Sequence, residues 1–238
     1  MHTIILAAGY ATRLYPLTKD TPKALLQVGQ KRVIEHILDC LREVPGMQGV
    51  TVVTNSRFFD QFAAWANGRS GVQVLNDGTT CNENRLGAVG DLCLAFRDID
   101  DDVLVVAGDN LFEFSMQRFV ERFRERDGML VAVRDLGEPA RVAKRFGVPV
   151  LDAEQRIIDF QEKPEKPTSG LASTAIYAIP RRLRAAILRV TKEVKMDNTG
   201  DLVRWICHQD RAYAFLFTEP WHDIGSPEEY AAARARFG

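Results

Sequence analysis

The sequence predicts an α/β protein whose central sheet is Rossmann-like, mostly parallel or mixed, and flanked by helices. Two observations support this prediction. Short segments of almost continuous apolar residues recur along the first half of the chain, at 3–7, 50–54, 72–75 and 103–107, as is typical of strands covered on both faces. Amphipathic helical patterns separate these segments, and strands that alternate with helices form parallel sheets.

The first half contains two helical patterns, and the second half is more varied. Apolar side chains follow the spacing of a helix face over residues 33–41 and again over residues 58–65. After Asp109 we expect a helix at about 115–126, a strand at 129–134, short strands near 147–151, 156–161 and 172–178, and helices near 180–191 and 199–208. No linker rich in Pro, Gly or Ser divides the chain, so we expect one domain over residues 1–238.

Composition indicates a globular protein with a sizeable core and excludes several partners. The chain is 46% hydrophobic and has a formal net charge of −1, so neither nucleic acid nor an anionic membrane is an implied partner. No two of its four cysteines have C-x-x-C spacing, which indicates free thiols in a reducing compartment. Neither a signal peptide nor an apolar run of membrane-spanning length is evident, so we expect the cytoplasm.

The segment from strand 3–7 to Lys23 is the most informative part of the chain. The strand runs into a turn of small residues at 8–12, then reaches Arg13 and, ten residues later, Lys23. Backbone N–H groups and fixed cations at the carboxyl end of a buried strand favour a polyphosphate ligand. A P-loop is excluded, because Lys23 is followed by Ala24 and no second glycine precedes it. A dinucleotide-binding G-x-G-x-x-G turn is also absent.

This segment resembles the motif L-[AG]-[AG]-G-x-G-[ST]-R-[LM], followed by P-K, of the sugar-phosphate nucleotidyltransferases, also called sugar-nucleotide pyrophosphorylases. The chain resembles a short glucose-1-phosphate thymidylyltransferase-like member, with the nucleotide-diphospho-sugar transferase fold. It matches the motif at Leu6, Ala8, Gly9, Thr12, Arg13, Leu14, Pro22 and Lys23. It departs at Ala11, where the family has glycine, and we expect the loop to differ from its relatives there.

Two aspartates are candidates for a metal site. Asp109 follows the strand 103–107 directly, where a carboxylate beside a phosphate loop is placed to bind Mg²⁺, although residue type alone favours a simple turn. Asp223 precedes a helix start at which Ser226 is the N-cap and Glu229 closes a capping box. The resemblance implies that Asp109 and Asp223 are the two protein ligands of Mg²⁺.

Glu162 and Lys163 are candidates for the acceptor site. On a strand, neighbouring side chains point to opposite faces, so we expect no ion pair between them, and a plain strand end is the alternative interpretation. The resemblance implies that Glu162 binds sugar hydroxyls and Lys163 the sugar phosphate. It implies a wider acceptor site formed by Asp109, Asn110, Gly147, Glu162, Lys163 and Thr174. Ala175 replaces a glycine of the relatives, which leaves acceptor contacts at residues 173–175 open.

The resemblance also implies a nucleotide site. It consists of Leu6, Ala8, Gly9, Tyr10, Ala11, Thr12, Asn76, Gly78 and Gly87. The loop from Asn76 to Gly87 falls where relatives recognise the base, but residues 76–78 would equally suit a plain turn. No side chain in this loop identifies the base.

The resemblance implies a Mg²⁺-dependent nucleotidyltransferase with Arg13, Lys23 and Lys163 as catalytic residues. A sugar 1-phosphate attacks the α-phosphate of a nucleoside triphosphate, giving a nucleotide sugar and pyrophosphate. Residues 1–110 would form the nucleotide-binding half and residues 111–238 the acceptor-binding half. Because the chain ends soon after the last motif, we expect no left-handed β-helix extension. Homo-oligomerisation stays open.

Two alternative functions remain. One is a cytidylyltransferase for a non-sugar phosphate such as phosphocholine, whose quaternary ammonium needs an aromatic or acidic cage; candidates are Trp205, Tyr177 and Trp221. The other is a catalytically silent regulatory subunit that binds a nucleotide sugar. The presence of the metal carboxylates and of Arg13 argues against the second alternative.

Overall fold

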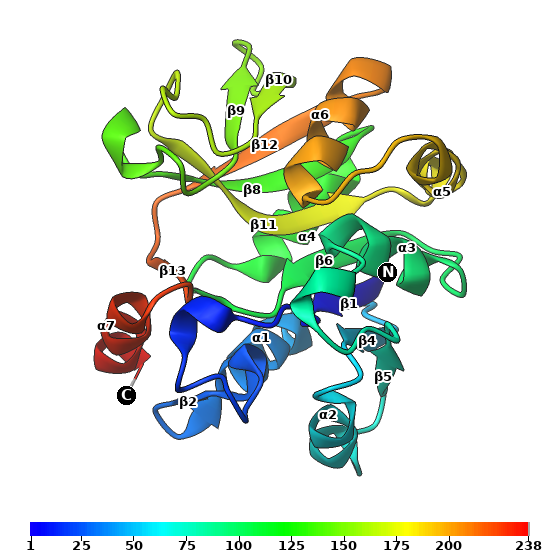
Figure 1. Ribbon diagram of the computed structural model, residues 1–238. Coiled ribbons are helices and arrows are strands. Elements are labelled where there is room, and N and C mark those ends of the chain that lie inside the picture. The colour runs from blue at the N-terminus through cyan, green and yellow to red at the C-terminus, as the bar shows by residue number, and fades with distance from the viewer. Residues whose placement is uncertain (238) are drawn as a thin grey trace.

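The computed structural model describes residues 1–237, and a seven-stranded mixed sheet runs through its centre (Figure 1). Strand β1 (His2–Leu6) is paired in parallel with β4 (Gly49–Thr54) on one side and with β6 (Val103–Ala107) on the other, and β5 (Val72–Asn76) lies beyond β4. Leu6, Val53 and Ala107 share one register position. The loops that follow β1 and β6 therefore leave from the same edge of the sheet.

The second half of the chain extends the same sheet. Strand β11 (Leu171–Ile179) is antiparallel to both β6 and β8 (Met129–Asp135), and β12 (Ala212–Phe217) lies parallel to β8 at the outer edge. The sheet order is β12-β8-β11-β6-β1-β4-β5. The predicted α/β fold is confirmed, although β12 was absent from the predicted strands.

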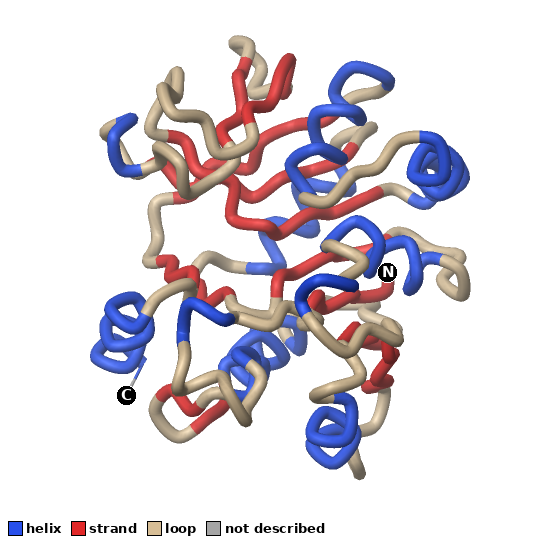
Figure 2. Tube along the Cα trace, viewed as in Figure 1, coloured by secondary structure: helices blue, strands red, loops and turns tan. Residues whose placement is uncertain are grey.

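Helices cover both faces of the sheet (Figure 2). One face packs against α3 (Ala88–Phe96), α5 (Arg184–Glu193) and α6 (Thr199–Gln209). The other packs against α1 (Val33–Arg42), α2 (Phe59–Ala66) and α4 (Met116–Glu125). Ile4 belongs to the first core and Ile5 to the second, as the alternation of side chains along a strand requires. This explains why the central strands are apolar almost throughout.

Smaller elements surround the sheet. Three two-stranded sheets pair β7 (Asn110–Phe112) with β13 (Trp221–Asp223), β9 (Val148–Leu151) with β10 (Ile157–Gln161), and β2 (Gln27–Val28) with β3 (Lys31–Arg32). Helix α7 (Pro227–Phe237) packs through Ala233 against a small core that includes Leu14, and so supports the first loop. Short 3₁₀ turns span Thr12–Leu14, Lys23–Leu25, Asn82–Asn84, Pro139–Arg141 and Arg181–Leu183.

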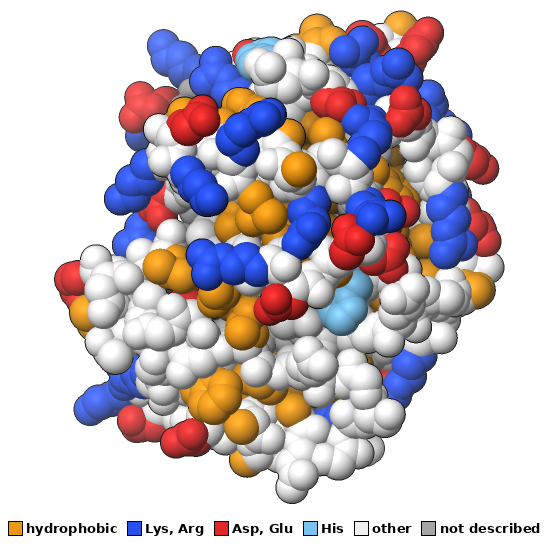
Figure 3. Space-filling model, turned by 90° about the vertical axis from the view of Figure 1, so that its right-hand side faces the viewer, with side chains coloured by type: hydrophobic (Ala, Val, Ile, Leu, Met, Phe, Trp, Pro, Cys, Tyr) orange, Lys and Arg blue, Asp and Glu red, His pale blue; other side chains and the backbone are white. Residues whose placement is uncertain are grey.

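The outer surface carries charges of both signs. Figure 3 shows lysine and arginine interspersed with aspartate and glutamate over one face of the molecule, without a continuous basic patch. None of the helices in residues 1–237 is both long and apolar enough to cross a membrane.

Candidate active site

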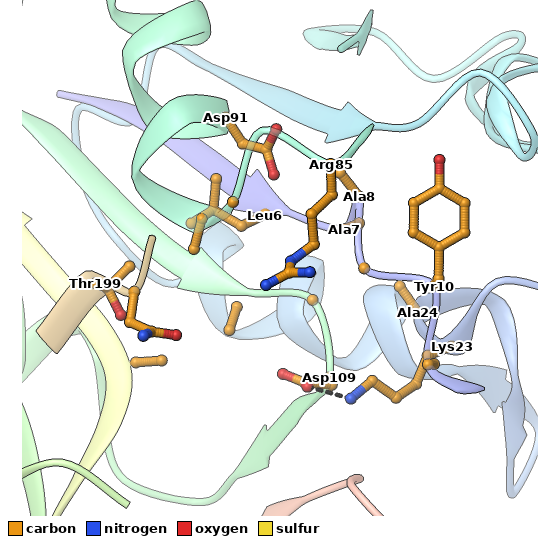
Figure 4. A pocket seen from close by; sticks show the side chains of 18 of the residues that line it. Leu6, Ala7, Ala8, Tyr10, Lys23, Ala24, Arg85, Asp91, Asp109 and Thr199 are labelled. Atoms are coloured by element: carbon orange, nitrogen blue, oxygen red, sulfur yellow. Dashed lines mark hydrogen bonds and ion pairs between the residues drawn. The ribbon is translucent and has the colours of Figure 1, made fainter. Parts of the chain in front are cut away.

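A cavity of about 400 Å³ opens at the carboxyl ends of β1 and β6 (Figure 4). The chain segments that line it come from both halves of the sheet. They are residues 6–13, 23–24, 82, 85, 87–88, 91, 107–109, 175 and 197–199. The first loop, which the sequence predicts to bind a polyphosphate, thus forms one wall, and Asp109 lies opposite Lys23.

The backbone of the first loop is held at Ala11. This residue has φ 48° and ψ 39°, in the left-handed region that glycine tolerates and other residues enter at a cost of roughly 1–2 kcal/mol. The buried Thr18 hydroxyl donates to the Ala11 carbonyl (2.7 Å), and the Leu14 amide donates to the same oxygen (3.0 Å). Ala11 therefore keeps the conformation expected of the family's glycine, and its difference from glycine is one of strain.

The two predicted cations of the loop have different surroundings. Arg13 is exposed at the cavity wall, and its guanidinium has no carboxylate partner among residues 1–237. Lys23 follows Pro22 in a 3₁₀ turn, and its Nζ forms an ion pair with Asp109 Oδ2 (Figure 4). Arg13 is therefore available to an anionic ligand, whereas Lys23 already offsets the charge of a carboxylate.

Asp109 and Asp223 are brought together by the pairing of β7 with β13. Asp223 lies opposite Asn110 in this ladder, and the Ile224 amide donates to the Asp109 carbonyl (3.0 Å). Burial, followed by the negative charge of Asp109, raises the pKa of Asp223 to about 7. Two residues that are distant in the sequence thus form one carboxyl pair next to Lys23.

Asn110 contributes to this pairing. Its side chain is buried; Oδ1 accepts from Trp221 Nε1 (2.6 Å) and Nδ2 donates to the Ala107 carbonyl (3.3 Å). Both ends of the amide are therefore engaged within the protein. The residue fixes Trp221, and through it β13 and Asp223, and an acceptor contact by Asn110 stays a prediction.

The helix start after Asp223 differs in detail from the predicted capping box. The Ser226 hydroxyl accepts from the Glu229 amide (3.3 Å), as expected of an N-cap. The Glu229 carboxylate, however, accepts from the Gly225 amide (3.0 Å) rather than from that of Ser226. Glu229 also forms an ion pair with Arg145. These contacts fix the backbone directly after the carboxyl pair.

Glu162 and Lys163 form an ion pair, with 3.4 Å between Oε1 and Nζ, so the expectation that they would not was wrong. Strand β10 ends at Gln161, and Lys163 has φ 45°, so strand alternation no longer applies to these two residues. Burial raises the pKa of Glu162 above its ordinary value. A side chain at Gly147 would place its Cβ 3.2 Å from Glu162 Oε2, and one at Gly200 would overlap the carboxylate. The two glycines leave room for Glu162.

Thr174 is not exposed to the cavity. It is 1% exposed, and its hydroxyl donates to the Ala132 carbonyl (3.0 Å) across the sheet. Its hydroxyl is therefore engaged within the sheet, and its assignment to the acceptor site stays a prediction. The neighbouring Ala175 lines the cavity instead, with φ 56°, where the β11–β8 register shifts between Ser173 and Tyr177. Like Ala11, Ala175 adopts a left-handed conformation, at a position where the resemblance implies glycine.

The predicted base-binding loop is only partly in the cavity wall. Asn76 Oδ1 accepts from the Ser56 hydroxyl (3.0 Å) and from the Gly78 amide (2.9 Å), which is the plain turn that the sequence left open. Neither Asn76 nor Gly78 lines the cavity. Gly87 does, with φ 80°, and a side chain there would overlap Asp197.

Asp197 joins the loop before α3 to the loop before α6. The Ala88 amide donates to the Asp197 carbonyl (2.9 Å), and the Arg85 guanidinium pairs with the Asp197 carboxylate (2.7 Å). Asn198 and Thr199 follow in the cavity wall. Sequence analysis missed Asp197, Asn198, Thr199 and Asp91. Asn198 and Asp201 form a capping box, which marks a helix start but gives no sign that it lies beside Gly87.

The three aromatic candidates for a quaternary-ammonium cage do not converge. Tyr177, on β11, belongs to the core that α6 covers, and Trp205 of α6 packs against that core. The Tyr177 hydroxyl is 2.9 Å from that of Thr199. Trp221 packs elsewhere, with its ring centroid 5.0 Å from that of Phe146. These side chains thus offer no aromatic cage.

Comparison with known proteins agrees with the geometry. The nucleotidyl transferase family model matches residues 2–237. The chain is 27% identical to the bifunctional protein GlmU of Methanocaldococcus jannaschii, over 95% of the chain and 52% of that protein. It is 30% identical to a glucose-1-phosphate adenylyltransferase of Fervidobacterium nodosum, over 95% of the chain and 59% of that protein. The chain thus spans little more than half the length of these relatives.

Solved structures show the same fold. A putative glucose-1-phosphate thymidylyltransferase from Bacillus anthracis, in complex with sucrose, superposes with a TM-score of 0.86 at 25% identity, covering 99% of this chain and 95% of that one. A UDP-glucose pyrophosphorylase complexed with UDP-glucose superposes with a TM-score of 0.83 at 20% identity, covering 99% and 97%. With the family match over nearly its whole length, the chain belongs to the nucleotidyl transferase family.

Proposed function

We propose that the protein transfers a nucleotidyl group from a nucleoside triphosphate to a sugar 1-phosphate, releasing pyrophosphate, and so acts in sugar-nucleotide biosynthesis. One observation carries this proposal: Arg13, Lys23 and Asp109 line a single cavity, and Asp223, which lies outside its lining, pairs with Asp109. Cations beside a carboxyl pair suit a polyphosphate that reacts with the help of a metal ion. The names of the relatives, which include a glucose-1-phosphate adenylyltransferase, support a sugar-phosphate acceptor.

The reaction needs no protein nucleophile. An acceptor phosphate oxygen forms a bond to the α-phosphorus, the bond from that phosphorus to the β-phosphate oxygen breaks, and pyrophosphate leaves with the electron pair. Catalysis then depends on positioning and charge neutralisation. Arg13 and the amides of the loop at residues 9–12 bind the β- and γ-phosphates, and Lys23 offsets charge at the reacting phosphate.

The donor set at Asp109 and Asp223 fits magnesium. Two carboxyl groups face each other, and the only cation in contact with them among residues 1–237 is Lys23. Magnesium binds through one or two carboxylates, together with waters and substrate phosphate oxygens. When bound, Mg²⁺ supplies positive charge to the phosphates. Asp109 and Asp223 hold the ion, and Lys23 limits their repulsion before it arrives.

Glu162 and Lys163 are placed to bind the acceptor. Lys163 is about half exposed, so its ammonium is accessible to a phosphate, whereas the less exposed Glu162 carboxylate can accept only from donors that reach its open side. Sugar hydroxyls donate to Glu162, and the sugar phosphate binds Lys163. Phosphocholine is the weaker alternative, because the candidate aromatic side chains lie apart.

The test is a matrix of five nucleoside triphosphates against a panel of sugar 1-phosphates and phosphocholine, measured by pyrophosphate release with Mg²⁺ and then with a chelator. We expect metal-dependent release with a sugar 1-phosphate. Release with phosphocholine alone would contradict the sugar acceptor. Nucleotide binding without release from any pair would favour the silent regulatory subunit.

Arg13→Ala tests the phosphate site directly. Removal of one such cation costs about a hundredfold or more in rate, while an exposed arginine without an ion pair contributes little to stability. Arg118→Ala is the matched control, because Arg118 is an exposed arginine on α4, away from the cavity. Equal rates for the two variants would refute the assignment of Arg13.

A further inference from the structure

Asp91 is a buried acid in the wall of the cavity. It lies in the first turn of α3 and is 6% exposed. Its neighbours along the helix, Val89 and Leu92, belong to the apolar core. Figure 4 shows its carboxyl group on the side of the cavity where Leu6 and Ala8 lie. Nothing in the proposed transfer of the nucleotidyl group uses this carboxyl group.

The Asp91 carboxyl group lacks a donor within the protein. Its Oδ1 atom is buried and has no hydrogen-bond partner among residues 1–237. A buried polar atom without a partner costs about 1–3 kcal/mol or more, so a bound ligand that supplies the donor is the simplest reason to retain it.

The groups around Asp91 cannot supply that donor. Its charged neighbour is Asp77, and a proton shared between the two carboxyl groups forms a hydrogen bond between them without giving Asp91 Oδ1 a donor. The Thr79 amide and hydroxyl already donate to Asp77, at 2.7 and 3.0 Å, and the Tyr10 hydroxyl lies 3.0 Å from that of Thr79. The guanidinium of Arg85 pairs with Asp197. The nearby donors are therefore engaged elsewhere.

This end of the cavity suits a nucleobase rather than a phosphate. Asp91 lines this end of the cavity, and Asp77 lies next to it but outside the lining, so the local charge disfavours a phosphate; the cations Arg13 and Lys23 belong to the first loop and the 3₁₀ turn after Pro22. The wall beside Asp91 is built from small and apolar residues, Leu6, Ala7, Ala8 and Ala88. A flat base against such a wall, with its polar edge toward Asp91, matches the usual composition of a base pocket.

We infer that Asp91 determines nucleotide specificity by accepting a hydrogen bond from the exocyclic amino group of the base, so that ATP, CTP or GTP is the substrate rather than UTP or dTTP. This inference rests on the proposed nucleotidyl transfer. Adenine, cytosine and guanine each carry an amino group, whereas uracil and thymine carry a carbonyl oxygen where cytosine has the amine. A carboxylate accepts from an amine and repels a carbonyl oxygen.

The test is to measure the dissociation constants of ATP, CTP, GTP, UTP and dTTP by isothermal titration calorimetry with the whole chain, without acceptor. We expect at least one amino-bearing triphosphate to bind about tenfold or more tightly than UTP and dTTP, since one good base contact gives about 1–3 kcal/mol. The tightest of the three identifies the base. This measurement needs no variant, so it does not depend on whether a substitution folds.

Asp91→Asn assigns the preference to this side chain. The amide keeps the size of the carboxyl group but replaces one acceptor with a donor, so the preference for the amino-bearing base should fall about tenfold, with a gain for UTP or dTTP. Asp98→Asn is the matched control, because Asp98 is an exposed acid just beyond the end of α3. It should leave all five constants unchanged.

The outcomes separate the two proposals. If none of the five triphosphates binds, the nucleotidyl transfer itself is wrong and the base inference falls with it. If triphosphates bind but UTP or dTTP binds as tightly as the others, the base inference alone is overturned. If Asp91→Asn keeps the full preference for triphosphates whose base carries an amino group, then the Asp91 side chain is not the cause of that preference.

Discussion

Asp91→Asn should stabilise the protein at neutral pH while leaving its stability in acid almost unchanged. Burial, with the charge of Asp77 as a further cause, raises the pKa of Asp91 from 3.8 to about 7. Between these two values the folded protein binds more protons than the unfolded chain. The free energy of unfolding therefore falls as the pH rises through this window. Asparagine does not titrate, so the Asp91→Asn variant does not lose this part of its stability.

The magnitude follows from the size of the shift. One pKa unit corresponds to about 1.4 kcal/mol, so a shift from 3.8 to about 7 gives a ceiling of about 4 kcal/mol. Relaxation of the buried site reduces this figure, and we expect the stability of the variant relative to the parent to increase by about 2–4 kcal/mol between roughly pH 4 and pH 8.

The assay is urea unfolding of the parent and of Asp91→Asn at several pH values across this window, without nucleotide. Asp223 and Glu162 also have raised pKa values, but they titrate in both proteins, so the difference between the two curves isolates Asp91. Asp98→Asn is the exposed control and should run parallel to the parent. A constant gap between the parent and Asp91→Asn at all pH values would refute the reasoning.

Three further predictions concern the backbone and the site. Ala175→Gly should raise the free energy of unfolding by about 0.5–1 kcal/mol, since φ 56° strains alanine; unchanged or lower stability in urea unfolding would contradict this. Gly200→Ala should raise the KM for the acceptor about tenfold or more while leaving nucleotide affinity unchanged, because the new Cβ overlaps the Glu162 carboxylate; equal losses for both substrates would argue for a general packing defect. Asp223→Asn should lower Mg²⁺-dependent pyrophosphate release about a hundredfold or more without loss of stability, since it relieves repulsion with Asp109; activity near that of the parent would exclude Asp223 as a metal ligand.

Much of the fold could be predicted from local patterns in the sequence. The four apolar segments of the first half are all strands of the central sheet, because a strand covered on both faces needs apolar side chains on both. Strand β12 was not recognised. It lies at the sheet edge, where Leu216 is 41% exposed, and its position depends on pairing with β8 rather than on its own pattern.

The candidate site also has parts that could be predicted from the sequence and parts that depend on the tertiary structure. The loop from β1 to Lys23 and the turn at Asp109 are contiguous motifs at strand ends, so their place at one edge of a parallel sheet followed from the sequence. The hydrogen-bond partners of Asn110 and Thr174 could not be predicted, because the partner of a buried polar side chain depends on distant strands. The ion pair between Glu162 and Lys163 was missed because the positive φ of Lys163, just beyond the end of strand β10, is set by the folded structure.

The sequence alone thus determined the α/β sheet, since strand and helix patterns rest on neighbouring residues; the phosphate loop and the two acidic metal positions that it predicts stay predictions. Only the tertiary structure decided that Asp223 meets Asp109, that Asp197 closes on Gly87, and that Asp91 is buried without a donor. Burial and charge proximity are properties of the packed chain, and they raise the pKa values of Asp91 and Asp223. The proposed phosphate contacts therefore rest on sequence motifs, whereas the proposed base contact rests on groups that only folding brings together.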